Sequence, residues 1–76
     1  MATITDDIFN RHIYKDEVIN IKAKEAKDGD VLVIQQRAYQ IKKAIPQPPG
    51  NIIFDFKQGV MLICKEEAIQ QKFIND

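Results

Sequence analysis

The chain has 76 residues, with eleven basic and eleven acidic side chains, so its formal net charge at pH 7 is zero. This length allows one domain, residues 1–76, with a small core. The content of 45% hydrophobic and 29% charged residues is typical of a globular protein. The neutral balance disfavours duplex DNA or an anionic membrane surface as a partner. A single cysteine excludes an internal disulfide, and no apolar run reaches the length of a membrane span, so we expect a cytoplasmic protein.

The first element in chain order is compatible with two structures. Thr5, Asp6 and Asp7 are residue types that cap helices, and a helix from there would place Ile4, Ile8 and other apolar side chains on one side. The alternative is a strand through residues 11–14. We favour the helix.

A β-hairpin is expected next. Residues 18–26 alternate between apolar and polar side chains, and residues 31–34 form a β-branched run that fits a buried strand. Between them lies Asp28-Gly29, a strong hairpin signal because a type I′ turn needs positive φ at both central positions. A two-residue loop there predicts that Ala23 lies opposite Ile34.

A third strand extends this sheet into a meander. Residues 38–44 return through a turn near Gln36-Arg37, which places Tyr39 opposite Ile34. The same apolar face then continues over all three strands. Because the side-chain period of a strand is two, a slip of one residue would turn every one of these side chains to the other face.

A second hairpin is predicted from residues 52–56 and 60–64. The loop Lys57-Gln58-Gly59 carries glycine where a three-residue hairpin needs left-handed geometry. This register pairs Phe54 with Leu62. Both faces of the hairpin are largely apolar, so both should be covered.

Two further segments complete the expected fold. Residues 45–51 contain three prolines and predict an extended connection, whereas residues 66–74 predict a short helix with Ile69 and Phe73 toward the sheet. The chain is therefore expected to be mostly β, with five antiparallel strands and a C-terminal helix. Its architecture would be a twisted sheet or a small barrel, and its element order resembles SH3-like and OB-like barrels.

The apolar surplus of the sheet suggests the function. Five side chains point away from the predicted core face, so they either close a barrel interior or form an exposed patch. Monomers rarely expose large apolar patches, and an uncovered set would therefore imply a partner or a second copy of the chain. The five residues are Val31, Val33, Ile53, Met61 and Ile63. We therefore expect a non-catalytic protein-interaction module, acting as a homodimer or as an accessory subunit of a larger assembly, a viral or mobile-element assembly included.

A basic stripe supports a rival hypothesis. Lys22, Lys24, Arg37 and Lys42 lie on the outward face of the meander or at its turn. A small barrel with such a stripe would bind single-stranded nucleic acid through the phosphate backbone. Zero net charge and the lack of an accompanying aromatic side chain make this the second choice.

Candidate chemistry is sparse. Cys64 is predicted to pack in a strand as a small apolar residue, and His12 to lie at the surface, so we expect no enzyme and assign no catalytic residue. Asp28-Gly29-Asp30 lacks the remaining ligands of a calcium loop, and one histidine with one cysteine does not complete a zinc site. No metal or cofactor is expected.

Overall fold

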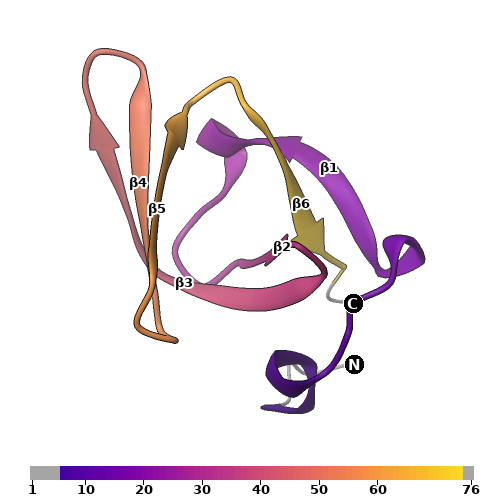
Figure 1. Cartoon of the computed structure of the whole chain (residues 1–76). Helices are drawn as coiled ribbons and strands as arrows, with labels where there is room; N and C mark the ends of the chain where they lie inside the picture. The colour runs from indigo at the N-terminus through magenta and orange to yellow at the C-terminus, as the bar shows by residue number, and fades with distance from the viewer. Residues whose placement is uncertain (1–5, 75–76) are drawn as a thin grey trace.

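The computed structural model describes residues 6–74, which form one antiparallel sheet of six strands and three short 3-10 helices (Figure 1). The spatial order of the strands is β1-β6-β2-β3-β4-β5. The elements in chain order are η1 Asp6–Asn10, η2 Lys15–Glu17, β1 Val18–Lys22, η3 Ala23–Glu25, β2 Val31–Ile34, β3 Arg37–Gln47, β4 Asn51–Phe56, β5 Met61–Lys65 and β6 Ile69–Phe73.

The mostly β class is confirmed, but the predicted strand count is wrong: there are six strands in this part of the chain, not five. The sheet curls strongly, with the β4–β5 hairpin on one side and β1 and β6 on the other (Figure 1). The edge strands β1 and β5 are not paired with each other, so the sheet does not close into a barrel. The SH3-like or OB-like barrel alternative is therefore not realised, and the open twisted sheet is.

The hairpin of β2 and β3 forms through a turn at Gln35-Gln36, two residues that both have positive φ, 51° and 67°. Positive φ at both central positions is what a two-residue hairpin turn requires. Tyr39 consequently pairs with Leu32 and not with Ile34. The prediction was wrong by two residues along the strand, which is one full side-chain period, so the expected apolar face was kept.

The turn at Asp28-Gly29 also forms, yet it does not join two paired strands. The Asp30 N–H donates to the Lys27 carbonyl across it at 3.0 Å, and Gly29 has a φ of 91°. Its first arm leaves the sheet at Ala23, whose N–H donates to the carbonyl of Ala68 at 2.8 Å. The predicted pairing of Ala23 with Ile34 is therefore wrong: a local turn reverses the chain without selecting the neighbouring strand.

The C-terminal segment is strand β6, so the predicted helix over residues 66–74 is also wrong. β6 pairs along its whole length with β1 and pairs with β2 on its other side, at Leu32 and Val33. It thus makes backbone hydrogen bonds to two strands. Hydrogen bonds to two strands stabilise this segment more than a helix of about two turns would, because so short a helix is only marginally stable by itself.

The β4–β5 hairpin forms as predicted. Phe54 pairs with Leu62, and Gly59 adopts the left-handed conformation, with a φ of 84°. The proline segment is extended, as expected, but it is also paired: β3 continues to Gln47, and Pro46 lies opposite Ile52 on β4. Because proline lacks an N–H, it removes only its own donor from the ladder.

One apolar core fills the concave side of the curled sheet. Its largest fully buried members are two stacked phenylalanines, Phe54 and Phe56, with ring centroids 6.2 Å apart. Tyr39 packs on the second ring at 5.5 Å. The other buried residues of this core are Ala23, Ala26, Leu32, Ile41 and Ile52.

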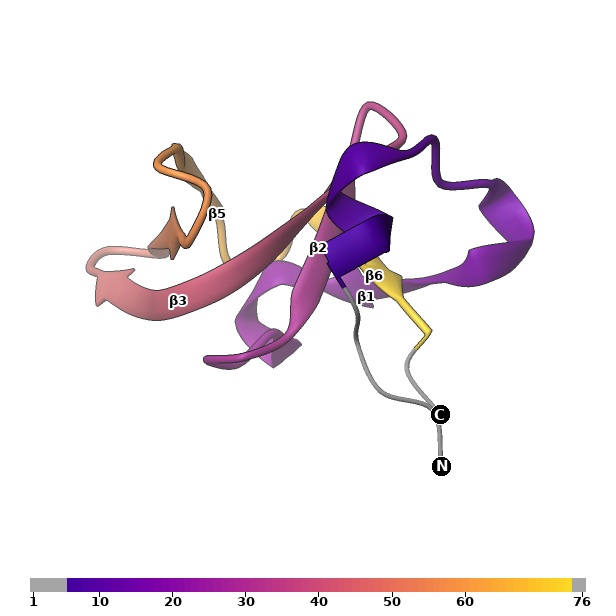
Figure 2. The same ribbon diagram turned by 90° about the horizontal axis from the view of Figure 1, so that it is seen from below.

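A second core lies on the opposite side of the sheet, under the N-terminal segment (Figure 2). Instead of the longer predicted helix, residues 6–10 form the 3-10 helix η1, and Ile4 and Thr5 lie outside the described residues. The N–H of Ile13 donates to the Gln36 carbonyl at 2.8 Å, which ties the segment to the β2–β3 turn. The buried members are Ile8, Ile13, Val31, Val33 and Ala38.

This second core predicts unequal costs for two isoleucine truncations. Ile13 is 1% exposed, so Ile13→Ala should lower the free energy of unfolding by about 2–5 kcal/mol. Ile19 on β1 is 49% exposed, so Ile19→Ala should change it by only about 0.5 kcal/mol. Urea denaturation of both variants measures the difference, and equal losses would contradict the packing of the N-terminal segment.

An ion pair fastens the same segment. Arg11 donates through Nη1 and Nη2 to the two carboxylate oxygens of Glu17, at 3.0 and 2.8 Å, and the Tyr14 N–H donates to the same carboxylate at 2.9 Å. The hydrogen bond from Arg11, followed by that from Tyr14, lowers the pKa of Glu17 to about 2. Since this pKa lies below the ordinary value of 4.5, the pair stabilises the fold above about pH 4.5 and is lost as the pH falls toward 2.

An NMR titration of the Glu17 carboxyl group checks this effect. In the wild-type chain it should titrate far below its ordinary range, and Arg11→Met should raise its pKa back toward 4.5. Arg37→Met removes a different arginine and should leave the Glu17 titration unchanged. A wild-type pKa near 4.5 would show that the pair does not form in solution.

Candidate protein-interaction surface

A row of three isoleucines crosses the convex face of β3, β4 and β5. Ile45 pairs with Ile53, and Ile53 pairs with Ile63, so the three side chains are direct cross-strand neighbours. Ile63 is 65% exposed, Ile45 is 37% exposed and Ile53 is half-buried. Met61, next along the same face of β5, is 62% exposed. We call these four side chains the isoleucine row.

Polar side chains border the row on both sides. Lys43 and Asp55 are cross-strand neighbours on one side, in line with Met61, and Gln47, Asn51 and Lys65 are neighbours on the other side. An apolar centre within a polar rim is the usual anatomy of a protein–protein interface. The arrangement suits a partner that covers the isoleucines and leaves the rim in water.

The predicted interface residues divide between two places. Val31 and Val33 are 2% and 4% exposed, because the chain's own N-terminal segment covers them. Ile53, Met61 and Ile63 lie together on the β4–β5 hairpin, on the face described above. Only this second group is accessible to a partner.

Ile45 belongs to the row although the sequence did not indicate it. The ladder between β3 and β4 shifts between Ile41 and Lys43, so Lys42 is the extra residue of a β-bulge. The bulge inverts the alternation of faces: Ala44 pairs with Phe54 toward the core, and Ile45 turns outward. The signal that could have indicated it was the pair of adjacent lysines, Lys42-Lys43, which interrupts the alternation of apolar and polar residues between Ile41 and Ile45.

The predicted basic stripe is not continuous. Lys22 and Lys24 both form ion pairs with Glu67, in the turn between β5 and β6, at 3.1 and 2.6 Å. Hydrogen bonding to Glu67 raises the pKa of Lys24, and the same pairing lowers the pKa of Glu67. Two of the four cations thus have a carboxylate partner within the chain.

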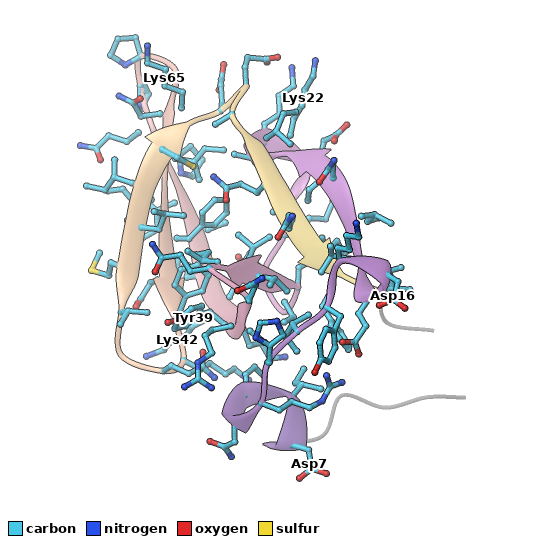
Figure 3. All side chains as sticks on the ribbon, turned by 45° about the vertical axis from the view of Figure 1, so that its right-hand side comes forward. Asp7, Asp16, Lys22, Tyr39, Lys42 and Lys65 are labelled. Atoms are coloured by element: carbon cyan, nitrogen blue, oxygen red, sulfur yellow. The ribbon has the colours of Figure 1, made fainter. Side chains whose placement is uncertain are left out.

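The other two cations lie elsewhere. Arg37 is exposed at the start of β3, beside the β2–β3 turn, and Lys42 is exposed at the bulge. Lys22 lies at one end of the molecule and Lys42 toward the opposite end (Figure 3). The four residues do not share one track that a phosphate backbone would follow.

Cys64 packs against the concave core, as predicted, and is half-buried. Desolvation raises the pKa of its thiol, against the smaller opposite effect of a hydrogen bond with Gln70. A nucleophilic cysteine needs a lowered pKa. His12 is exposed, as predicted, and its ring lies against Tyr14 with centroids 4.7 Å apart.

The acidic residues of the turn at residues 28–30 are engaged by the backbone. Asp28 accepts the N–H of Ala44 at 2.8 Å, and Asp30 accepts the N–H of Lys27 at 2.9 Å. Lys72 lies 3.7 Å from the same Asp30 carboxylate. Within residues 6–74, no group of three or more histidine, cysteine, aspartate or glutamate side chains is placed to hold a metal ion.

A surface hollow of about 550 Å³ lies beside the N-terminal segment and is lined by His12, Tyr14, Lys15, Asp16 and Gln36. Tyr14 is the large apolar side chain of this lining and is 60% exposed. Its lining contains no serine, threonine or cysteine and a single carboxylate, so it has neither a nucleophile of these types beside a base nor a pair of carboxylates.

Comparison with known proteins does not assign the chain to a group: no family model, curated protein or solved structure matches it significantly. No helix among the described residues is long and apolar enough to cross a membrane. The role of the isoleucine row is therefore inferred from the structure and not from a related protein.

The ion pairs of Glu67 predict how the chain behaves toward nucleic acid. The wild-type chain should bind a single-stranded oligonucleotide weakly at low salt, and Glu67→Gln should tighten binding by a few-fold, because it releases Lys22 and Lys24. Glu66→Gln is the control, since Glu66 forms no salt bridge with either lysine in the described structure. Wild-type binding that falls with salt at a log–log slope of about −3 would instead support four cations on one strand.

Proposed function

We propose that this chain is a non-catalytic, cytoplasmic protein-interaction module that binds its partner through the isoleucine row. The observation that supports the proposal is the cross-strand alignment of Ile45, Ile53 and Ile63, with Met61 beside them, on a face that no described segment of the chain covers. The described part of the N-terminal segment covers the neighbouring part of the same convex side.

The energetics of burial favour this role. Fully burying an isoleucine or methionine side chain contributes roughly 1.5–3 kcal/mol. Ile63 and Met61 retain more than half of their exposure, so covering them would recover most of that amount for each. A contiguous apolar patch with a polar rim is characteristic of binding surfaces.

The state of the reactive side chains also supports a non-catalytic role. The Cys64 thiol faces the core with a raised pKa, and so is poorly suited to act as a nucleophile. Lys22 and Lys24 are both paired with Glu67, so their charges are partly neutralised within the chain. The apolar convex face is therefore better suited to binding a partner than a basic groove would be.

A capture experiment with a matched pair of variants tests the proposal. Ile63→Lys places a charge at the exposed end of the isoleucine row, and Ile69→Lys places the same charge on β6, at an isoleucine of nearly equal exposure, 62% against 65%. Proteins retained from cells by the immobilised wild-type chain should be lost with Ile63→Lys, by tenfold or more, and kept with Ile69→Lys.

Circular dichroism and urea denaturation verify that both variants fold, as expected for substitutions at exposed positions. Retention by both variants that is as strong as by the wild-type chain would show that binding does not use the isoleucine row. Equal loss in both would point to a general effect of surface charge.

A further inference from the structure

β5 is an edge strand with unpaired backbone groups. Its single neighbour is β4. The Phe56 N–H donates to the Val60 carbonyl at 2.9 Å, so Val60 and every second residue after it direct their backbone groups toward β4. Because alternate residues of an edge strand bond inward, the N–H groups of Met61, Ile63 and Lys65 point outward. No side chain in the described structure bonds to any of these three amides.

The opposite edge, β1, is protected. The outward amide of Lys22 donates to the Glu25 carboxylate at 2.9 Å, and the 3-10 helices η2 and η3 adjoin the two ends of the strand. Side chains that occupy outward backbone groups and short segments that cover the edge are ways in which proteins block edge pairing. β5 is therefore the open edge of this sheet, and its outward residues are those that carry the exposed end of the isoleucine row.

From this edge we infer that the partner is a second copy of the chain, paired antiparallel along β5 about a two-fold axis at Ile63. The inference rests on the proposed function and names its partner. Ile63 is the central residue of β5, so this register pairs the whole strand: Ile63 with itself, Leu62 with Cys64 and Met61 with Lys65. The outward groups of Ile63 would then exchange two hydrogen bonds with those of the second copy.

The isoleucine row continues without interruption across this axis. Ile45, Ile53 and Ile63 of one copy run directly into the same three residues of the other, in reverse order. An isologous interface requires a surface that is complementary to itself. The row meets that requirement because its exposed end lies at the axis.

The charges agree with the same register. Lys65 comes opposite Met61 of the second copy, and Met61 is the cross-strand neighbour of Asp55. The lysine therefore approaches a carboxylate across one intervening strand, and no like charges lie directly opposite one another along β5. Opposite charges at such positions stabilise strand pairs, and like charges destabilise them.

Cysteine cross-linking tests the register, with Cys64 replaced by alanine in every variant. In a hydrogen-bonded antiparallel pair the Cα atoms lie about 5.5 Å apart, within the range that a disulfide spans. Ile63→Cys should therefore form a covalent dimer with itself on mild oxidation. Met61→Cys should not, because its two copies would lie roughly 13 Å apart, but it should cross-link with Lys65→Cys in a mixture.

Charge exchange gives an independent readout by sedimentation equilibrium. K65E and D55K should each weaken the wild-type dimer roughly two- to tenfold. Mixing the two variants should restore the affinity, because each contact across the axis then joins opposite charges. Failure of the mixture to recover, or cross-linking of Met61→Cys with Ile63→Cys instead, would overturn the register.

The same data separate this inference from the proposed function. A chain that stays monomeric at every concentration and forms no Ile63→Cys dimer overturns the self-pairing. If that monomer still retains a cellular protein that Ile63→Lys loses, the interaction module stands and its partner is a different protein. If it retains none, both proposals fail.

Discussion

The pairing of β6 with β2 is the constraint on which the rest of the structure depends. Its two register positions, Leu32 with Lys72 and Val33 with Gln71, bring the C-terminal strand into the middle of the sheet. β1 is thereby moved one strand outward and becomes an edge. At the other end of the sheet the β4–β5 hairpin has no further strand to pair with. Both edges of the sheet, the protected β1 and the open β5, follow from the position of β6 between β1 and β2.

The same arrangement explains why the sheet needs cover on both sides. In β2 three successive residues, Val31, Leu32 and Val33, are buried, which is possible only when both faces are packed. The concave side is covered by the curl of the sheet itself, and half of the convex side by the N-terminal segment. The other half, over β3, β4 and β5, carries the isoleucine row. The surface proposed for binding is thus the part of the convex face that no described residue of the N-terminal segment covers.

Charge and apolar surface are separated in this molecule. The lysines near the β5–β6 turn are held by Glu67, and the Arg11–Glu17 pair fastens the N-terminal segment, so these charges serve the fold. On the convex face, Lys65 and Asp55 belong to the rim of the isoleucine row. A neutral chain with internally paired charges has little long-range attraction for a polyanion. This surface instead favours binding through short-range contacts, made by apolar side chains and by the edge of a strand.

Local features of the sequence determined five of the six described strands, β1 to β5, together with the β4–β5 hairpin and most of the side chains that share the concave face, because period-two alternation and glycine in a left-handed loop act within a few residues. They also indicated that Cys64 packs inward and that Met61, Ile53 and Ile63 form an apolar surplus. Only the tertiary structure decided that residues 69–73 form a strand, that Val31 and Val33 are covered, and that a bulge at Lys42 turns Ile45 outward. These outcomes depend on backbone hydrogen bonds between segments far apart in the chain, and local patterns carry no information about which distant segment supplies them.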